Sequence, residues 1–248
     1  MDLRLADRNA AVAASSAGLG FAVAAALAAE GAQVAICGRD EARVREAAER
    51  IGPGARPFVA DVATTQGATG FVEQATGALG QIDILVTNAG GPPPGTFATT
   101  TIDGYVDALW LNLLSTIAMC QVAVPPMRSR GWGRVVGIAS MGARQPIPGM
   151  IASNTARAGT VAFLKTLATE VAPDGVTVNA VLPGSHATDR IRGMYGDDMS
   201  PAIRNVPVGR IGVPADFGSV VAFLSSEEAG FITGSAVSVE GGACGGLL

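Results

Sequence analysis

The clearest chemical signal is the turn Ser-Ser-Ala-Gly-Leu-Gly at positions 15–20. The apolar run Ala10–Ala14 precedes it, and apolar residues recur every fourth position over Leu19–Leu27, which predicts a strand, a tight loop and a helix. Glycine permits close backbone approach, so N–H groups at the positive end of the helix can hold a phosphate. The pattern predicts a dinucleotide cradle, although Gly18 and Gly20 can equally serve helix packing.

Other residue types exclude several kinds of site. His186 is the only histidine, so a histidine-rich metal site is excluded by count. Cys37, Cys120 and Cys244 are far apart and show no CxxC spacing, which favours neither a disulfide framework nor a zinc site. We therefore expect no metal, and a reducing, cytoplasmic environment.

The elements that must position this turn follow an alternating pattern. Alternation of strand-like and helix-like segments predicts a parallel sheet with crossover helices. The expected strands are Ala10–Ala14, Gln33–Cys37, Arg56–Val59, Ile82–Thr87, Gly133–Ile138, Val176–Val181 and Ala236–Val239. The expected helices after the first are Asp40–Ile51, Thr64–Gly77, Tyr105–Arg130, Ile151–Ala172 and Pro214–Ser225. The sequence thus predicts one α/β domain over residues 1–248, a Rossmann-type, doubly wound, mostly parallel seven-stranded sheet.

The amino-acid composition and charge argue against two kinds of binding partner, nucleic acid and membrane. Hydrophobic residues make up 48% and charged residues 15%, which is typical of a folded globule. The net charge of −4, without any basic run, argues against nucleic-acid binding. The uncharged stretch Ala10–Ala29 is rich in alanine and interrupted by serine and glycine, so we expect no membrane span.

Several short motifs occur in a fixed order along nearly the whole chain. They are Gly18-Leu19-Gly20, Asp61-Val62, Thr87-Asn88-Ala89-Gly90, Asn112, Ser140, Pro183-Gly184 with Thr188, and Phe231-Ile232-Thr233-Gly234 before Glu240-Gly241-Gly242. Together they resemble the short-chain dehydrogenase/reductase family, close to its 3-oxoacyl-(acyl-carrier-protein) reductase-like branch. The family's threonine and first glycine in the cofactor loop are Ala13 and Ala14 here.

The resemblance implies a nicotinamide cofactor. NAD-preferring relatives place an acidic residue after the second strand, whereas this chain has Arg39, whose planar fork suits a 2′-phosphate. We therefore expect NADP, with NAD possible; the alternative is a solvated Arg39 beside Asp40. The other cofactor residues that the resemblance implies are Ala14, Ser16, Gly18, Leu19, Gly20, Asp61, Val62, Asn88, Ala89, Gly90, Pro183, Gly184 and Thr188.

The resemblance also implies a catalytic serine, Ser140, and an asparagine, Asn112, that holds a relay water. The family's Tyr-x-x-x-Lys segment aligns with Met150 to Asn154, so the proton donor and its helper are both missing. Four candidates for a substitute are His186, Arg157, Arg144 and Tyr195. We expect the two arginines to be surface or subunit-contact residues and His186 to be a bystander.

Three functions remain open. The first is an NADP(H)-dependent oxidoreductase acting on a small, mostly apolar carbonyl or alcohol, with an atypical active site. The second is a cofactor-binding or partner subunit without turnover, and the third is a non-redox lyase or isomerase using the same pocket. A homotetramer or dimer is expected from the resemblance and from a small-residue helix face at Ala152, Ala156, Gly159, Thr160 and Ala162.

Overall fold

Seven strands form a single sheet in the order β3-β2-β1-β4-β5-β6-β7, and each of the six pairings is parallel. The computed structural model describes residues 2–196 and 198–246. The strands are β1 (Asn9–Val12), β2 (Gln33–Gly38), β3 (Ala55–Val59), β4 (Ile84–Thr87), β5 (Gly133–Ile138), β6 (Val176–Pro183) and β7 (Ala236–Val239). The expected doubly wound, seven-stranded α/β fold is confirmed.

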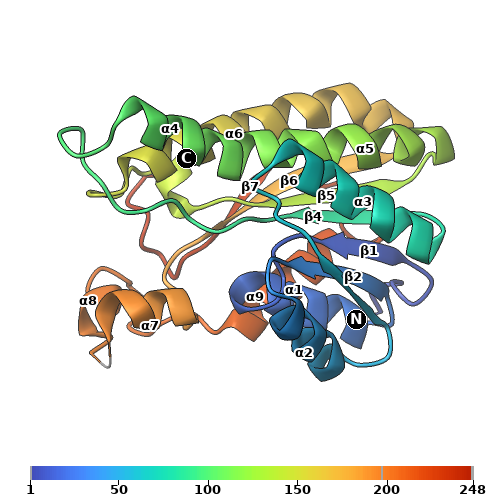
Figure 1. Cartoon of the computed structure of the whole chain (residues 1–248), viewed down its shortest axis with the longest axis horizontal. Helices are drawn as coiled ribbons and strands as arrows, with labels where there is room; N and C mark the ends of the chain where they lie inside the picture. Colours follow the sequence, from blue (N-terminus) through green and yellow to red (C-terminus); the bar gives the residue numbers. More distant parts are fainter. Residues whose placement is uncertain (1, 197, 247–248) are drawn as a thin grey trace.

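Helices cover both faces of the sheet (Figure 1). One face carries α1 (Gly18–Ala29), α2 (Glu41–Ile51) and α9 (Pro214–Leu224); the other carries α3 (Thr65–Leu79), α5 (Ser115–Arg130) and α6 (Ile151–Val171). Strand interiors such as β4 are buried at every position, as expected for a parallel sheet covered on both sides. Each face has its own apolar cluster, one containing Phe71 and the other containing Phe217.

The helix predicted from Tyr105 to Arg130 is longer and is divided into three parts. α4 (Ile102–Leu109) begins where the Thr101 hydroxyl accepts a hydrogen bond from the backbone of Gly104, a cap that the apolar spacing alone did not reveal. A π-helical turn, η1 (Trp110–Leu114), separates α4 from α5. Such turns are common at functional sites, and this one contains the buried Asn112.

By length and composition alone, residues 102–130 could cross a membrane. Half of the most apolar window of this helix is buried inside the molecule, where α5 packs against α3, α6 and the sheet. Its apolar character is therefore accounted for by packing in the core.

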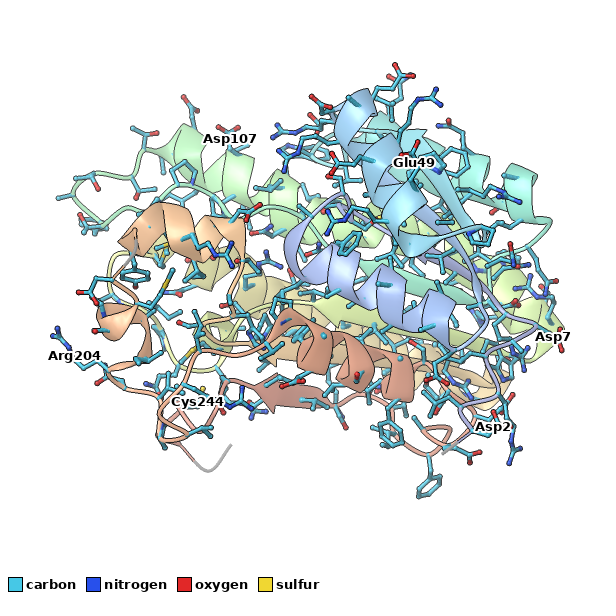
Figure 2. The ribbon with its side chains drawn as sticks, turned by 90° about the horizontal axis from the view of Figure 1, so that it is seen from below. Asp2, Asp7, Glu49, Asp107, Arg204 and Cys244 are labelled. Carbon is cyan, nitrogen blue, oxygen red and sulfur yellow. The ribbon has the colours of Figure 1, made fainter. Side chains whose placement is uncertain are left out.

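Two short helices follow β6, and the sequence pattern did not predict them. They are α7 (Asp189–Tyr195) and α8 (Ser200–Ile203), and they stand apart from the sheet in Figure 1. Figure 2 shows Arg204 and Cys244 at this end of the molecule and Asp2 and Asp7 at the opposite end. Because α7 comes directly after β6, this end is the one to which the carboxyl ends of the parallel strands point.

Candidate active site

A cavity of about 960 Å³ lies beyond the carboxyl ends of the strands. Its walls are the loops that follow β1, β2, β3, β4, β5 and β6, together with α7 and the first turns of α6. Every predicted cofactor residue except Gly20 lines it, and so does Ser140. The topology therefore brings residues from position 14 to position 188 into one site.

The turn at one end of the cavity has the geometry of a phosphate cradle. Ala14 and Gly18 both adopt left-handed backbone angles, with φ of +46° and +61°. Gly20 lies behind the cavity, where a Cβ would collide with the Ala14 carbonyl and the Asn88 side chain. Helix α1 starts after Ala17 without a side-chain cap, which leaves its first N–H groups available to an anion. These features fit a bound phosphate.

Two arginines border the neighbouring part of the cavity. Arg39 and Arg43 both line it, beside Ser16 and Gly38. A Cβ on Gly38 would meet the Ser16 hydroxyl at 2.8 Å, so the strand end and the cradle are in close contact. The carboxylate of Asp40 accepts a hydrogen bond from the backbone of Arg43 and caps α2. It forms no ion pair with Arg39 in the part of the chain that the structure describes.

The serine and asparagine that the resemblance predicts to be catalytic lie at different depths. Ser140 lines the cavity, and its Oγ accepts a hydrogen bond from the backbone of Gly142 at 3.0 Å. Asn112 lies behind the wall, where its Nδ2 donates to the Gly90 carbonyl at 2.9 Å. Its Oδ1 is buried without a partner, and its backbone carbonyl accepts from Thr160 at 3.2 Å. Asn112 thus supports the loop after β4 from behind.

The predicted pairing of Met150 with Asn154 is wrong. Met150 lines the cavity but precedes α6, which begins at Ile151. Asn154 turns back to the preceding loop: its Oδ1 accepts from the Ile147 backbone at 3.3 Å, and its Nδ2 donates to the Ile147 carbonyl at 2.9 Å. The two side chains therefore do not share a cavity-facing surface, because Asn154 holds the loop that leads into the helix.

The cavity-facing pair on α6 is Ser153 and Arg157, which are also four residues apart. Arg157 was expected at the surface, and this prediction is wrong, because the residue is only 7% exposed. Its guanidinium donates to the carbonyls of Ile138 and Ala89, at the ends of β5 and β4. Burial, with a smaller contribution from the nearby charge of Arg190, lowers its pKa to about 10, so it stays charged at neutral pH.

The remaining candidates for a proton donor differ in their access to the site. His186 lines the cavity and is buried; its Nδ1 lies 3.1 Å from the Gly184 carbonyl and its ring packs edge-on against Phe217. Burial lowers its pKa, which favours the neutral imidazole. Tyr195 lines the cavity from α7, whereas the Arg144 side chain bonds to β7 residues outside it.

The described residues bring together no group of three or more histidine, cysteine or acidic side chains suited to a metal ion. The polar lining of the site includes backbone amides, hydroxyls and guanidinium groups. Groups of this kind bind and orient anions and carbonyl oxygens.

The family model described as "Enoyl-(Acyl carrier protein) reductase" matches residues 13–244. The chain belongs to the short-chain dehydrogenase/reductase family. It is 36% identical to acetoacetyl-CoA reductase from Shinella zoogloeoides, over 95% of this chain and 98% of that protein. It is 34% identical to 3-oxoacyl-[acyl-carrier-protein] reductase from Haemophilus influenzae, over 92% and 94% of the two chains. The sequence-based resemblance is therefore confirmed.

Solved structures of the family superpose closely on this fold. L-sorbose reductase from Gluconobacter frateurii, complexed with NADPH and L-sorbose, gives a TM-score of 0.93 at 32% identity over the whole of both chains. An NADPH-bound short-chain oxidoreductase from Pseudomonas aeruginosa PAO1, described as containing an atypical catalytic center, gives 0.91 at 33% identity, over 97% and 98% of the chains.

Sequence reasoning named Arg157 as a candidate but missed three other polar residues that line this short-chain dehydrogenase/reductase site: Arg43, Ser153 and Arg190. Arg43 follows Arg39 by four positions, and Arg157 follows Ser153 by the same interval, so helical spacing was a usable signal in both pairs. Arg190 had no such signal, because α7 was not predicted.

Proposed function

We propose that this protein is an NADP(H)-dependent oxidoreductase that interconverts a small carbonyl compound and its alcohol. One observation carries the proposal: a single cavity joins the cradle at Gly18 and the two arginines, Arg39 and Arg43, to Ser140 and Arg157. The arginines suit a 2′-phosphate, which favours NADP over NAD. When bound, the cofactor supplies or accepts a hydride.

The residues of the chain then orient the substrate. The Ser140 hydroxyl accepts from Gly142 and keeps its own proton to donate to a carbonyl oxygen. Arg157 stabilises the negative charge that develops on that oxygen, either directly or through Ser153. Neither group is an acid suited to neutral pH, since arginine holds its proton and a serine hydroxyl is too weak. We therefore propose that a group other than Ser140 and Arg157 supplies the proton and that turnover is slow.

Cofactor binding and turnover test this proposal separately. Fluorescence titration should show that NADPH binds more tightly than NADH. Reduction of a panel of generic ketones and β-ketoesters with NADPH should be detectable but well below the usual range of ~1–10³ s⁻¹. No binding of NADPH would refute the function, and turnover at ordinary rates would refute the proposed defect in acid catalysis.

A second candidate is a cofactor-binding subunit without redox turnover. The cavity-facing pair on α6 favours it, because neither Ser153 nor Arg157 is an acid suited to neutral pH. Binding of NADPH with no turnover of any carbonyl or alcohol would select this candidate over the first.

We further propose that residues 1–248 form one domain, that the protein is cytoplasmic, and that it assembles as a dimer or tetramer. The small-residue face of α6 does not support the assembly, because Ala152, Ala156 and Thr160 are already buried within the chain. An apolar stripe on α4 and η1 supports it instead: Ile102, Val106 and Trp110 are 76%, 43% and 40% exposed. Light scattering should report at least twice the 24.9 kDa of one chain.

A further inference from the structure

Two guanidinium groups face the part of the cavity beyond Ser140. Arg157, on α6, is a buried lining residue, and Arg190, on α7, is an exposed one. In the described part of the chain, no carboxylate lies within ion-pair distance of either group. Arg157 also has a buried Nε without a hydrogen-bond partner. Burying the positive charge of Arg157 without a counter-charge is costly, and the exposed Arg190 adds a second positive charge nearby, so this region favours an anion.

Arg190 is held in position by the loop after β4. Its guanidinium lies over Gly91, where a Cβ would collide with it, and its Nη2 is 3.4 Å from the Pro92 carbonyl. Arg190 therefore connects α7 to this loop across the cavity and still has donors free for a ligand. Its position depends on the missing side chain of Gly91.

Arg190 lies apart from the phosphate cradle at Gly18. Thr188, two residues earlier, packs its methyl group against the Cβ position of Gly18, whereas Arg190 lies against Gly91. Among the residues that the structure describes, the acidic ones that line the cavity are Asp61, after β3, and Asp189, in the first turn of α7. Asp189 lies beyond ion-pair distance from Arg190, so its carboxylate does not neutralise the positive charge of Arg190 through an ion pair.

We propose that the substrate is an oxo acid or the corresponding hydroxy acid, and that Arg190 binds its carboxylate while Ser140 and Arg157 face its carbonyl oxygen. The inference rests on the proposed function and adds a substrate class to it. Apolar side chains of Ile147, Met150 and Met194 line the same region, so the carbon chain of the acid is covered by apolar surface. A guanidinium pairs with a carboxylate through two parallel hydrogen bonds, which gives both affinity and orientation.

Binding without turnover tests the proposal. Acetoacetate and methyl acetoacetate differ chiefly in charge, and neither can be reduced in the presence of NADP⁺. Calorimetric titration of each compound into the full chain, with and without NADP⁺, should show that acetoacetate binds about tenfold more tightly or better, as expected for a charge-assisted hydrogen bond. Equal affinities for acid and ester in the unaltered protein would overturn the proposal.

Substitutions of Arg190 test whether this residue causes the preference for the acid over the ester. Arg190→Gln should remove the preference for the acid, and Arg190→Lys should retain part of it, because lysine keeps the charge but loses the planar fork. Arg204→Gln is the matched control: Arg204 is exposed at the same end of the molecule, outside the cavity lining, and points outward in Figure 2. It should leave the preference unchanged.

The cofactor's pyrophosphate is the other possible source of an anion. If Arg190→Gln weakens NADP⁺ binding and lowers the affinities for acid and ester equally, the arginine serves the cofactor and the proposal is wrong. The titrations without NADP⁺ keep the question separate from the proposed function, because they measure the carboxylate preference even if the cofactor does not bind.

Discussion

The two ends of the cavity are built from different parts of the chain. At the cofactor end, backbone geometry dominates: a left-handed Ala14, a left-handed Gly18 and the uncapped start of α1. At the substrate end, side chains dominate, and Ser153 and Arg157, not the expected Met150 and Asn154, form the pair four residues apart on α6 that lines the cavity. Backbone geometry tolerates substitution by any small residue, whereas proton transfer requires particular side chains. The first end can therefore persist while the second changes its chemistry.

The largest effect is expected from placing the family's tyrosine and lysine at the two cavity-facing positions of α6. Ser153→Tyr combined with Arg157→Lys should raise turnover of a generic ketone by ~10²-fold or more, because a positioned acid is regained and lysine lowers the pKa of the tyrosine. The measurement is steady-state oxidation of NADPH, with circular dichroism to verify folding.

Met150→Tyr combined with Asn154→Lys is the matched control for this double variant. It should give no gain in turnover. It should also loosen the loop before α6, because replacing Asn154 removes both of its hydrogen bonds to Ile147. A gain from the control pair and none from Ser153→Tyr with Arg157→Lys would show that the positions assigned here are wrong.

A second test changes the charge at the cofactor end. Arg39→Asp should weaken NADPH binding by about tenfold or more while changing NADH binding little, since only NADPH carries the 2′-phosphate. Arg45→Asp is the control, because Arg45 lies on α2 outside the cavity lining and pairs with Glu41 at 2.7 Å. Equal losses for both cofactors in Arg39→Asp would show that the arginine has no role in selecting NADP.

A third test concerns His186, which lies between the two ends. Burial, opposed by its contact with Gly184 and by Asp216, lowers its pKa below the ordinary value of 6.5. The unfolded state therefore binds more protons just below pH 6.5, so the free energy of unfolding falls as pH drops through 6.5 and levels off below the folded-state pKa.

Proton NMR measures this pKa directly, because the chain has one histidine and hence one set of imidazole signals. Urea unfolding at pH 7.5 and pH 5.5 should show the loss of stability, and His186→Asn should reduce that loss. A midpoint at or above 6.5 in the folded protein would contradict the assignment.

The smallest expected effect is at Ala14. Ala14→Gly should stabilise the protein by about 0.5–1 kcal/mol, because relief of the left-handed alanine, ~1–2 kcal/mol, exceeds the added entropy of the unfolded chain. Ala13→Gly is the control and should destabilise, since Ala13 is fully buried and has no positive φ. The midpoints of denaturant unfolding of the two variants, compared with that of the unaltered protein, measure both changes in stability. Destabilisation by both would mean that Ala14 is not strained.

The sequence predicted which residues line the cofactor end of the cavity, but not which side chains of α6 face its substrate end, for a physical reason. Alternating apolar segments determine a parallel sheet, and the sheet places the loops after its strands together, so residues that the family resemblance implied, such as Asp61 and Thr188, line one cavity. The side chains on α6 depend on where the helix begins and how it is rotated. The start was predicted correctly at Ile151, but no local pattern revealed the rotation: Asn154 bonds back to Ile147, and the cavity-facing pair, Ser153 and Arg157, lies three residues beyond the predicted one.

The strand order has a consequence for synthesis. β1 to β4 are neighbours in the sheet and all lie before residue 88, whereas β5, β6 and β7 add to one edge in chain order. A chain emerging from the ribosome can pair its first four strands, and so form the phosphate cradle, before Ser140 has been made. Helix α1, however, packs extensively on α9. Its apolar face stays uncovered until residues 214–224 have been translated, so the nascent chain exposes hydrophobic surface through most of its synthesis.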